Sequence, residues 1–149
     1  MAWQLFVDTL NQSEGTIGSA IIGLKEGIIY SKTKEITFDK IKQKKDTEEE
    51  TESEMIDEIK TLIKFMEHKE KEELTDGIWV GGEQFKMNSE DKEKKLVLFE
   101  KDDKGVVVAM TATVLIISRW EKKEDQPNNL ENCKTAVIDM AEKFESAGH

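Results

Sequence analysis

Few residues in this chain are of the types that most often carry out catalysis. Among its 149 residues there is one cysteine, Cys133, and there are two histidines, His68 and His149. Cys133 lies on the apolar side of a helical pattern, His68 lies among charged residues and His149 ends the sequence, so the pattern gives no support for a cysteine–histidine dyad. Phosphate-binding loops, zinc-ligand spacings and nucleophile elbows are absent from the sequence. We therefore expect no catalytic residue, no metal site and no cofactor, and we predict that the protein is not an enzyme.

The charged residues are numerous but are arranged as solvated surface. They make up 36% of the chain, and the net charge is -10. Carboxylates occur mostly in runs such as Glu48 to Glu50, which are typical of an exposed face. A negative field repels phosphate backbones, and Arg119, the single arginine, leaves the chain almost without the bidentate groups that read guanine or clamp phosphate. These features argue against a nucleic-acid partner.

Two lysine clusters are the exception to this acidic surface. One covers Lys40 to Lys45 and the other covers Lys92 to Lys95. Such clusters can meet anionic lipid headgroups, although each is flanked here by acidic residues. Anionic lipid headgroups are therefore a candidate partner.

The sequence favours a cytoplasmic protein. A single cysteine cannot form an internal disulfide, which suits a reducing compartment. The first residues, MAWQLFVDTL, have neither the basic start nor the long apolar run of a signal peptide, and other apolar runs are too short to span a bilayer. The length fits one domain, and we expect a monomer without a transmembrane segment.

The first third of the chain predicts a helix followed by a hairpin. Trp3, Phe6, Val7 and Leu10 follow the spacing of an amphipathic helix that ends near residue 11. Isoleucine-rich segments at 16–24 and 28–32, with glycine in the turn between them, predict two antiparallel strands.

The middle of the chain predicts a charged insert and a helix. Residues 39–54 contain almost nothing apolar and are expected to form a mobile, solvated extension or the polar start of a helix. Thr51 and Glu54 fit a capping box. Apolar residues continue from Met55 to Met66 at helical spacing, which indicates a helix of about 15 residues.

The second half predicts a strand meander and a closing helix. Strands are expected at 77–82, 84–87, 95–99, 106–110 and 113–118, separated by glycine-rich or acidic turns. Asn128 and Glu131 fit a second capping box, and the segment from Cys133 to Phe144 keeps one apolar helical face. The predicted class is α+β, a mostly antiparallel sheet flanked by helices, in one domain over residues 1–149 with the charged insert at 39–54.

Three segments of the chain resemble the profilin family. The first is the opening helix with Trp3 and Phe6, followed by the strand segment AIIG at 20–23. The second and most specific is GIWVGGEQF at 77–85, with the following hairpin from Gly105 to Leu115. The third is the last helix with its short tail, GH. Residues 34–75 depart from the family by being longer and more charged, and Ala109 and Met110 stand where many profilins carry basic residues. These departures fit a divergent member, such as an archaeal one.

The resemblance implies a groove for proline-rich peptides between the terminal helices, which profilins hold side by side on one face of the sheet. By position, the groove residues are Trp3, Phe6, Tyr30, Phe144 and His149. A polyproline II ligand is already extended, so flat aromatic faces can bind it at a low entropic cost. Considered without the resemblance, Trp3 and Phe6 read more simply as the core face of a helix. Phe6 and His149 replace tyrosines of many profilins, and Lys143 lies at the rim, so proline binding is expected to be weak or absent.

The resemblance also implies an actin-binding surface on the later strands and the first half of the last helix. By position, its residues are Gln84, Lys86, Asn88, Leu130, Glu131 and Lys134. A profilin of this kind binds actin monomers, covers one end of the subunit, limits spontaneous nucleation and associates with the cytoskeleton. The alternative reading of these six residues is ordinary solvated surface.

A different function for the same pattern of elements is a sensor or scaffold domain of the PAS or longin type. A PAS sensor needs a ligand cavity inside its sheet and helices, whereas a profilin core is filled. A small molecule bound to the purified protein would separate the two.

Overall fold

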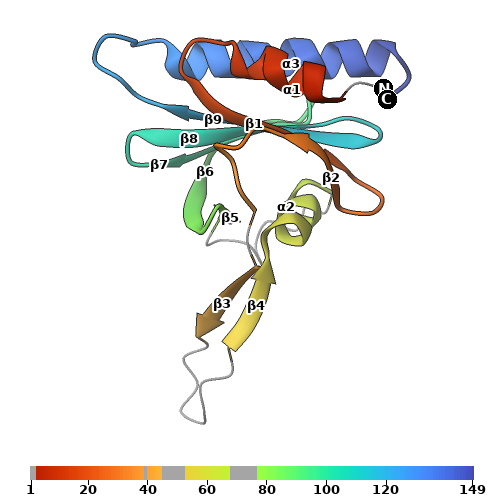
Figure 1. Ribbon diagram of the computed structural model, residues 1–149, viewed down its shortest axis with the longest axis vertical. Coiled ribbons are helices and arrows are strands. Elements are labelled where there is room, and N and C mark those ends of the chain that lie inside the picture. The colour runs from red at the N-terminus through yellow and green to blue at the C-terminus, as the bar shows by residue number, and fades with distance from the viewer. Residues whose placement is uncertain (1–2, 39, 45–52, 68–76) are drawn as a thin grey trace.

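The computed structural model describes residues 3–38, 40–44, 53–67 and 77–149 (Figure 1). Its helices and strands are α1 (Trp3–Asn11), β1 (Thr16–Gly23), β2 (Ile28–Lys32), β3 (Lys40–Lys44), β4 (Ser53–Asp57), α2 (Glu58–Glu67), β5 (Ile78–Val80), β6 (Glu83–Asp91), β7 (Leu96–Lys101), β8 (Lys104–Met110), β9 (Val114–Glu121) and α3 (Asn129–Ser146). Seven strands form one sheet in the order β2-β1-β9-β8-β7-β6-β5. All neighbours in it are antiparallel.

The sheet is covered on both faces, as Figure 1 shows: α1 and α3 lie together on one face, and α2 lies on the other. One hydrophobic cluster fills the space under α1 and α3, and a second fills the space under α2. The predicted class is therefore confirmed: a mostly antiparallel sheet is flanked by helices, and the N- and C-terminal helices pack together on one face.

Burial of both faces explains why the central strands read as continuous apolar runs. Side chains alternate between the two faces of a strand. In β7, Leu96 and Leu98 belong to the cluster under α1 and α3, whereas Val97 and Phe99 belong to the cluster under α2. Each central strand therefore needs apolar residues at successive positions.

The β5–β6 hairpin depends on two glycines. Gly81 and Gly82 have φ values of 60° and 82°, a conformation that glycine adopts without steric cost. A two-residue turn with positive φ at both positions matches the twist of antiparallel strands. It places Val80 opposite Glu83 and so fixes the register of β6, which carries half of the predicted actin-binding residues.

The predicted capping box at Thr51 and Glu54 is wrong, because Glu54 lies in a strand. Residues 53–57 pair with residues 40–44 as an antiparallel hairpin, here called the arm, which projects from the body (Figure 1). This pairing satisfies the backbone before the helix begins. The helix starts at Glu58, where Oδ1 of Asp57 accepts the N–H of Lys60 at 3.2 Å.

The arm also corrects the expectation of a loop or helix start at 39–54. Strands occupy 40–44 and the beginning of β4. Thr51 and the acidic run at 48–50 lie outside the described residues, as does most of the charged connection. A segment whose backbone N–H and C=O groups are paired across a hairpin can form regular strands without burying its side chains.

The second capping box, Asn128 with Glu131, is also wrong in detail. The helix begins as predicted, but Asn128 has φ -105° and ψ 20°, and its side chain makes no capping hydrogen bond. Its carbonyl accepts the N–H of Asn132 at 2.9 Å. The next residue, Asn129, donates instead to the carbonyl of Glu121 at 2.6 Å and so ties the start of α3 to the end of β9.

In the part of the chain that the structure describes, no helix is long and apolar enough to cross a membrane.

Candidate functional site

The five aromatic residues that the resemblance singled out lie together as one aromatic cluster: Trp3, Phe6, Tyr30, Phe144 and His149. Trp3 is at its centre, with ring centroids 5.0 Å from Tyr30, 5.6 Å from Phe144 and 5.8 Å from His149. Phe6 lies 5.0 Å from Phe144 in an edge-to-face arrangement. Segments from both ends of the chain thus build a single surface.

Local packing sets the orientation of the exposed ring in this cluster. Tyr30 lies on edge strand β2 and is 44% exposed. It rests on Gly23 of the neighbouring strand, where an added Cβ would lie 2.5 Å from the Tyr30 hydroxyl and ring. Phe144, by contrast, is almost fully buried. The aromatic cluster is therefore part of the buried core at Phe144 and exposed to solvent at Tyr30.

The end of the chain is held against the same cluster. The N–H of His149 donates to the carbonyl of Phe144 at 2.8 Å, and its own carbonyl accepts the N–H of Thr113 at 3.0 Å. Gly148 turns the chain with φ 88°. These bonds fix the His149 ring beside Trp3.

The cluster offers flat apolar surface and few polar groups. Its donors are the indole N–H of Trp3, the hydroxyl of Tyr30 and the ring of His149. Phe6 and Phe144 contribute none. Such a surface suits an extended ligand that presents apolar rings and carbonyl acceptors.

The six predicted actin-binding residues lie on β6 and on the first half of α3, which are here together called the β6–α3 face: Gln84, Lys86, Asn88, Leu130, Glu131 and Lys134. Lys86 pairs across the sheet with Glu100 of β7. Leu98 lies two residues before Glu100 on the same strand, and its side chain lies in the cluster under α1 and α3. Lys86 and, two residues before it, Gln84 therefore point to the same side of the sheet as α3. Leu130 packs against that same cluster from α3.

Two hollows lie on this face, and the first of them connects β6 and β7 with α3. Lys134 lines one with Ser89 and Leu98. Gln84 and Lys86 line the other together with Trp79, Glu100 and Asp102. The helix α3 packs mainly on β9 and β8, which leaves the neighbouring strands open on this side.

Asn88 is the extra residue of a β-bulge. Met87 pairs with Phe99 and Ser89 with Leu98, so Asn88 has no partner in the register. A bulge bends its strand and redirects the side chains that follow. Without it, Ser89 would point to the α2 side rather than toward Lys134.

Sequence reasoning missed several residues of the β6–α3 face, among them Trp79, Leu98, Glu100 and Asp102. They lie on strands that are distant from α3 in the sequence. Cross-strand register would have found Glu100 as the partner of Lys86, but a single sequence does not give the register.

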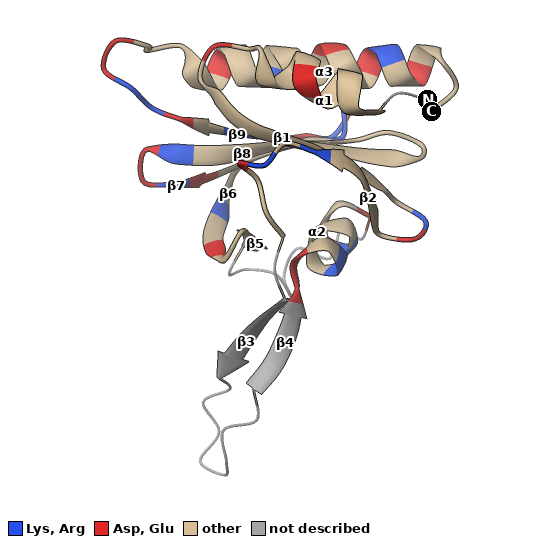
Figure 2. Cartoon of the chain, in the orientation of Figure 1, with Lys and Arg blue, Asp and Glu red and all other residues tan. Residues whose placement is uncertain are grey.

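Charged residues gather mainly at turns and near strand ends (Figure 2). At one such end, on the α2 side, Glu83 contacts Lys104 and lies 3.5 Å from Arg119 and 3.8 Å from Lys101. The hydrogen bond from Lys104, helped by the charges of Arg119 and Lys101 against the opposing effect of burial, lowers the pKa of Glu83 from 4.5. This network joins β6 to β7, β8 and β9.

A buried carboxylate connects α2 to the same hairpin. Glu58 is 1% exposed, and its two oxygens accept the N–H groups of Gly81 at 2.8 Å and Gly82 at 2.9 Å. A buried charge requires such hydrogen bonds. The first residue of α2 thereby holds the turn that precedes β6.

Cys133 is placed to pack rather than to react. It is fully buried on α3 within the cluster under the terminal helices. Burial raises the pKa of its thiol to about 12, so the thiolate is almost absent at neutral pH. His149 lies at the exposed end of the aromatic cluster, and His68 is outside the described residues.

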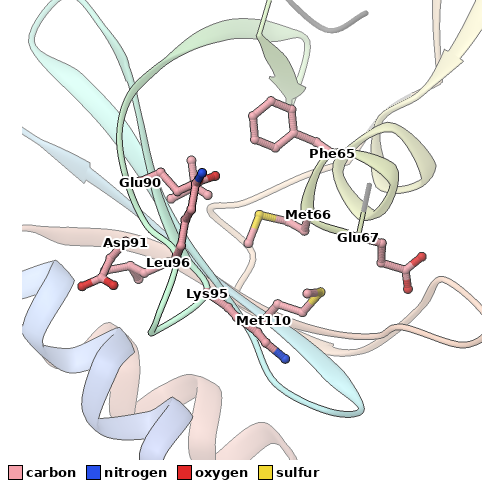
Figure 3. A pocket seen from close by; sticks show the side chains of 10 residues that line it. Phe65, Met66, Glu67, Glu90, Asp91, Lys95, Leu96 and Met110 are labelled. Atoms are coloured by element: carbon pink, nitrogen blue, oxygen red, sulfur yellow. The ribbon is translucent and has the colours of Figure 1, made fainter. Parts of the chain in front are cut away.

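A separate hollow of about 120 Å³ lies on the α2 face of the sheet (Figure 3). Phe65 and Met66 of α2, Met110 of β8 and the β6–β7 turn line it. It shares no residue with the aromatic cluster or the β6–α3 face, and nothing in the described residues indicates an occupant.

Comparisons with known proteins point to one family. The family model of the profilins matches residues 1–149. No curated protein sequence matches the chain.

Several solved profilin structures share the fold. Profilin II of Acanthamoeba castellanii is 19% identical, with a TM-score of 0.71 over 99% of this chain and 100% of the other. Mouse profilin IIa, solved with a double repeat from the FH1 domain of mDia1, is 16% identical, with a TM-score of 0.69 over 100% of both chains. LokiProfilin1, solved in complex with rabbit actin, is 16% identical, with a TM-score of 0.63 over 95% of this chain and 93% of the other.

Proposed function

Because the chain belongs to the profilin family, whose model matches residues 1–149, we propose that it binds actin monomers and regulates their polymerisation. It acts as a binding module rather than an enzyme. The related LokiProfilin1 was solved with rabbit actin, which makes that actin a practical probe.

The observation that carries this proposal is the β6–α3 face. Strand β6 and helix α3 are 38 residues apart in sequence at their nearest ends, Asp91 and Asn129, yet Lys134 shares a hollow with Ser89 and Leu98. An interface needs on the order of 1,000 Å² with a few well-packed anchors. Leu130, half-buried on α3, offers an apolar anchor here, with Lys86 and Lys134 as charged surroundings.

The proposed mechanism is steric. The protein covers one end of an actin subunit, which prevents that subunit from entering a spontaneous nucleus. The other end of the subunit stays free to join a growing filament. This mechanism comes from the family resemblance, and the β6–α3 face is the surface that we propose for it.

We also propose that the aromatic cluster binds proline-rich peptides weakly. Its geometry gives Trp3 and Tyr30 as flat surfaces, with few donors for the peptide carbonyls. Each missing hydrogen bond costs about 1 kcal/mol, or several-fold in affinity. We expect dissociation constants from high micromolar to millimolar.

Anionic headgroups are a weaker candidate. The β6–β7 turn exposes Lys92, Lys94 and Lys95, but Asp91 and Glu93 are exposed in the same turn. The side chains of the other lysine cluster, at 40–45, lie outside the described part. Phosphoinositide binding therefore stays a prediction from the resemblance.

The actin proposal is tested by polymerisation. Excess protein should lengthen the lag phase of rabbit actin assembly. Lys86→Glu and Lys134→Glu should each weaken binding of the monomer several-fold, because a reversed charge at an interface repels the partner while an exposed side chain contributes little to stability. Lys25→Glu, in the β1–β2 turn, is the matched control and should bind as the wild type does.

An unchanged lag phase together with no complex at low salt would refute actin binding. Undiminished binding by both charge-reversed variants would place actin on another surface.

A further inference from the structure

Strand β5 turns one large apolar side chain, that of Trp79, toward the α3 side of the sheet. The neighbours of Trp79 in the strand, Ile78 and Val80, are fully buried in the cluster under α2. Side chains alternate between the two faces of a strand, so Trp79 points to the opposite side. Its cross-strand partner is Gln84, which points to that same side. Trp79 therefore lies beside the β6–α3 face, on the edge strand of the sheet.

The surface around Trp79 is open on this side. Helix α3 packs mainly on β9 and β8, and β7 and β6 separate β8 from β5. Trp79 is half-buried, and with Gln84 and Lys86 it lines a hollow of about 530 Å³. Part of its indole is therefore buried against the protein, and part faces the hollow. A partner that contacts Gln84 and Lys86 must also cover Trp79, because all three residues line the same hollow.

The charged groups around this hollow balance one another. Its lining contains two cations, Lys86 and Lys101, and two carboxylates, Glu100 and Asp102. Lys86 is opposite Glu100 in the strand register, and Lys101 lies 3.8 Å from Glu83. The lining carries no net charge, so it does not favour an occupant of either sign. The apolar surface of the indole is the feature that distinguishes this hollow.

A tryptophan within a ring of polar side chains has the composition of a binding hot spot. Tryptophan is enriched at such positions because one flat side chain buries a large apolar area, and the surrounding polar groups keep water away from it. Here Gln84, Lys86 and Glu100 supply those polar groups. An apolar side chain on an edge strand is otherwise a risk, because edges can pair with other chains, and β5 limits that risk by being three residues long.

We propose that Trp79 is the principal anchor for the actin monomer and that its exposed ring receives an apolar side chain of actin in this hollow. Gln84 and Lys86 contact polar groups around that side chain. Leu130 is then the apolar contact at the α3 end of the interface, and Trp79 is the contact at the β5 end. This inference rests on the proposed function, and it names the residue and the chemistry that determine affinity there.

The first experiment measures the affinity for monomeric rabbit actin. Trp79→Ala should weaken binding about thirty-fold, the usual effect of truncating a central tryptophan. Trp79→Phe keeps a flat aromatic face and should stay within about five-fold of the wild type. The control Ile28→Ala removes an exposed apolar side chain from β2, the opposite edge strand, and should bind normally. Normal binding by a folded Trp79→Ala variant would overturn the inference and leave the proposed function standing.

A second experiment needs no change to the anchor, so it also decides the case in which Trp79→Ala does not fold. The protein is labelled with 5-fluorotryptophan, and the fluorine NMR signal of Trp79 is assigned by its loss in Trp79→Phe. Saturating actin should move this signal, whereas that of the buried Trp120 should keep its position. An unmoved Trp79 signal in a protein that binds actin would overturn the inference alone. A wild-type protein that binds no actin would refute the proposed function and the inference with it.

Discussion

Trp3 makes ring contacts with each of the other members of the aromatic cluster. It therefore has two roles that a single substitution can confuse: we propose that it contacts a proline-rich peptide, and its ring packs against Phe6 of α1 and Phe144 of α3. Both roles follow from its position, at the first residue of α1 and beside the exposed Tyr30.

Trp3→Ala should abolish whatever binding a decaproline peptide shows. A tryptophan at the centre of an interface typically contributes about 2 kcal/mol or more. Tryptophan fluorescence gives the titration of the wild type, and calorimetry gives that of the variant. Circular dichroism checks that Trp3→Ala is folded. If Trp3→Ala does not fold, Trp3→Phe is tested in its place, because it retains an aromatic face.

Phe6→Tyr provides the opposite change, since it restores a phenolic donor and should strengthen peptide binding several-fold. Low-micromolar binding of decaproline by the wild type would contradict the prediction that the aromatic cluster binds proline-rich peptides weakly. A folded Trp3→Ala variant that binds as well as the wild type would place the peptide elsewhere.

At the scale of elements, the arm and α2 are held in place in different ways: the arm by backbone pairing within itself, and α2 by packing against the sheet. The strands of the arm find their backbone partners in each other, and α2 is the one other element that contacts β4 closely among the described residues. By contrast, α2 buries Leu62 and Phe65 against the sheet. Glu58 then ties it to the β5–β6 turn.

Replacing residues 41–56 by a short glycine–serine linker should lower the free energy of unfolding by less than about 1 kcal/mol, because little outside the arm depends on it. Phe65→Ala is the comparison and should cost about 3 kcal/mol or more, since it opens a cavity in the core. Chemical denaturation measures both. A large loss of stability from the arm deletion would show that the arm packs against the body.

At the scale of the whole molecule, the ion network at Glu83 holds together four neighbouring strands of the sheet. Its carboxylate lies on β6, and its cationic partners lie on β7, β8 and β9. The network therefore couples the β5–β6 hairpin to the centre of the sheet. Its contribution to stability must depend on pH.

Glu83→Gln should lower the free energy of unfolding by about 1 kcal/mol at pH 7, the upper range for partly exposed pairs. Because the pKa of Glu83 is lowered in the folded state, the stabilisation is fully present above pH 4.5 and is lost as the pH falls through the folded value. The difference between variant and wild type should therefore shrink below pH 4.5. Denaturation at pH 7, 4.5 and 3 measures it, and an unchanged difference at pH 3 would show that charge is not its origin.

The sequence by itself determined the class of fold and the positions of most elements. Helical spacing at Trp3 to Leu10 and from Cys133 to Phe144, and apolar runs such as Val106 to Val108, are local consequences of which faces become buried. The resemblance, carried by short ordered segments, then indicated the family. Local pattern and short motifs are properties of neighbouring residues, so one sequence is enough to read them.

Only the tertiary structure decided which distant residues meet. The pairing of 40–44 with 53–57 replaced a predicted helix start, and the bulge at Asn88 decided which side chains of β6 turn toward Lys134. The meeting of Trp120, Asn129 and the β7–β8 turn around one hollow likewise depends on strand register and on where α3 begins. Register is fixed by packing across the sheet, between residues far apart in the chain, and a shift of one residue would reverse the direction of every side chain in a strand.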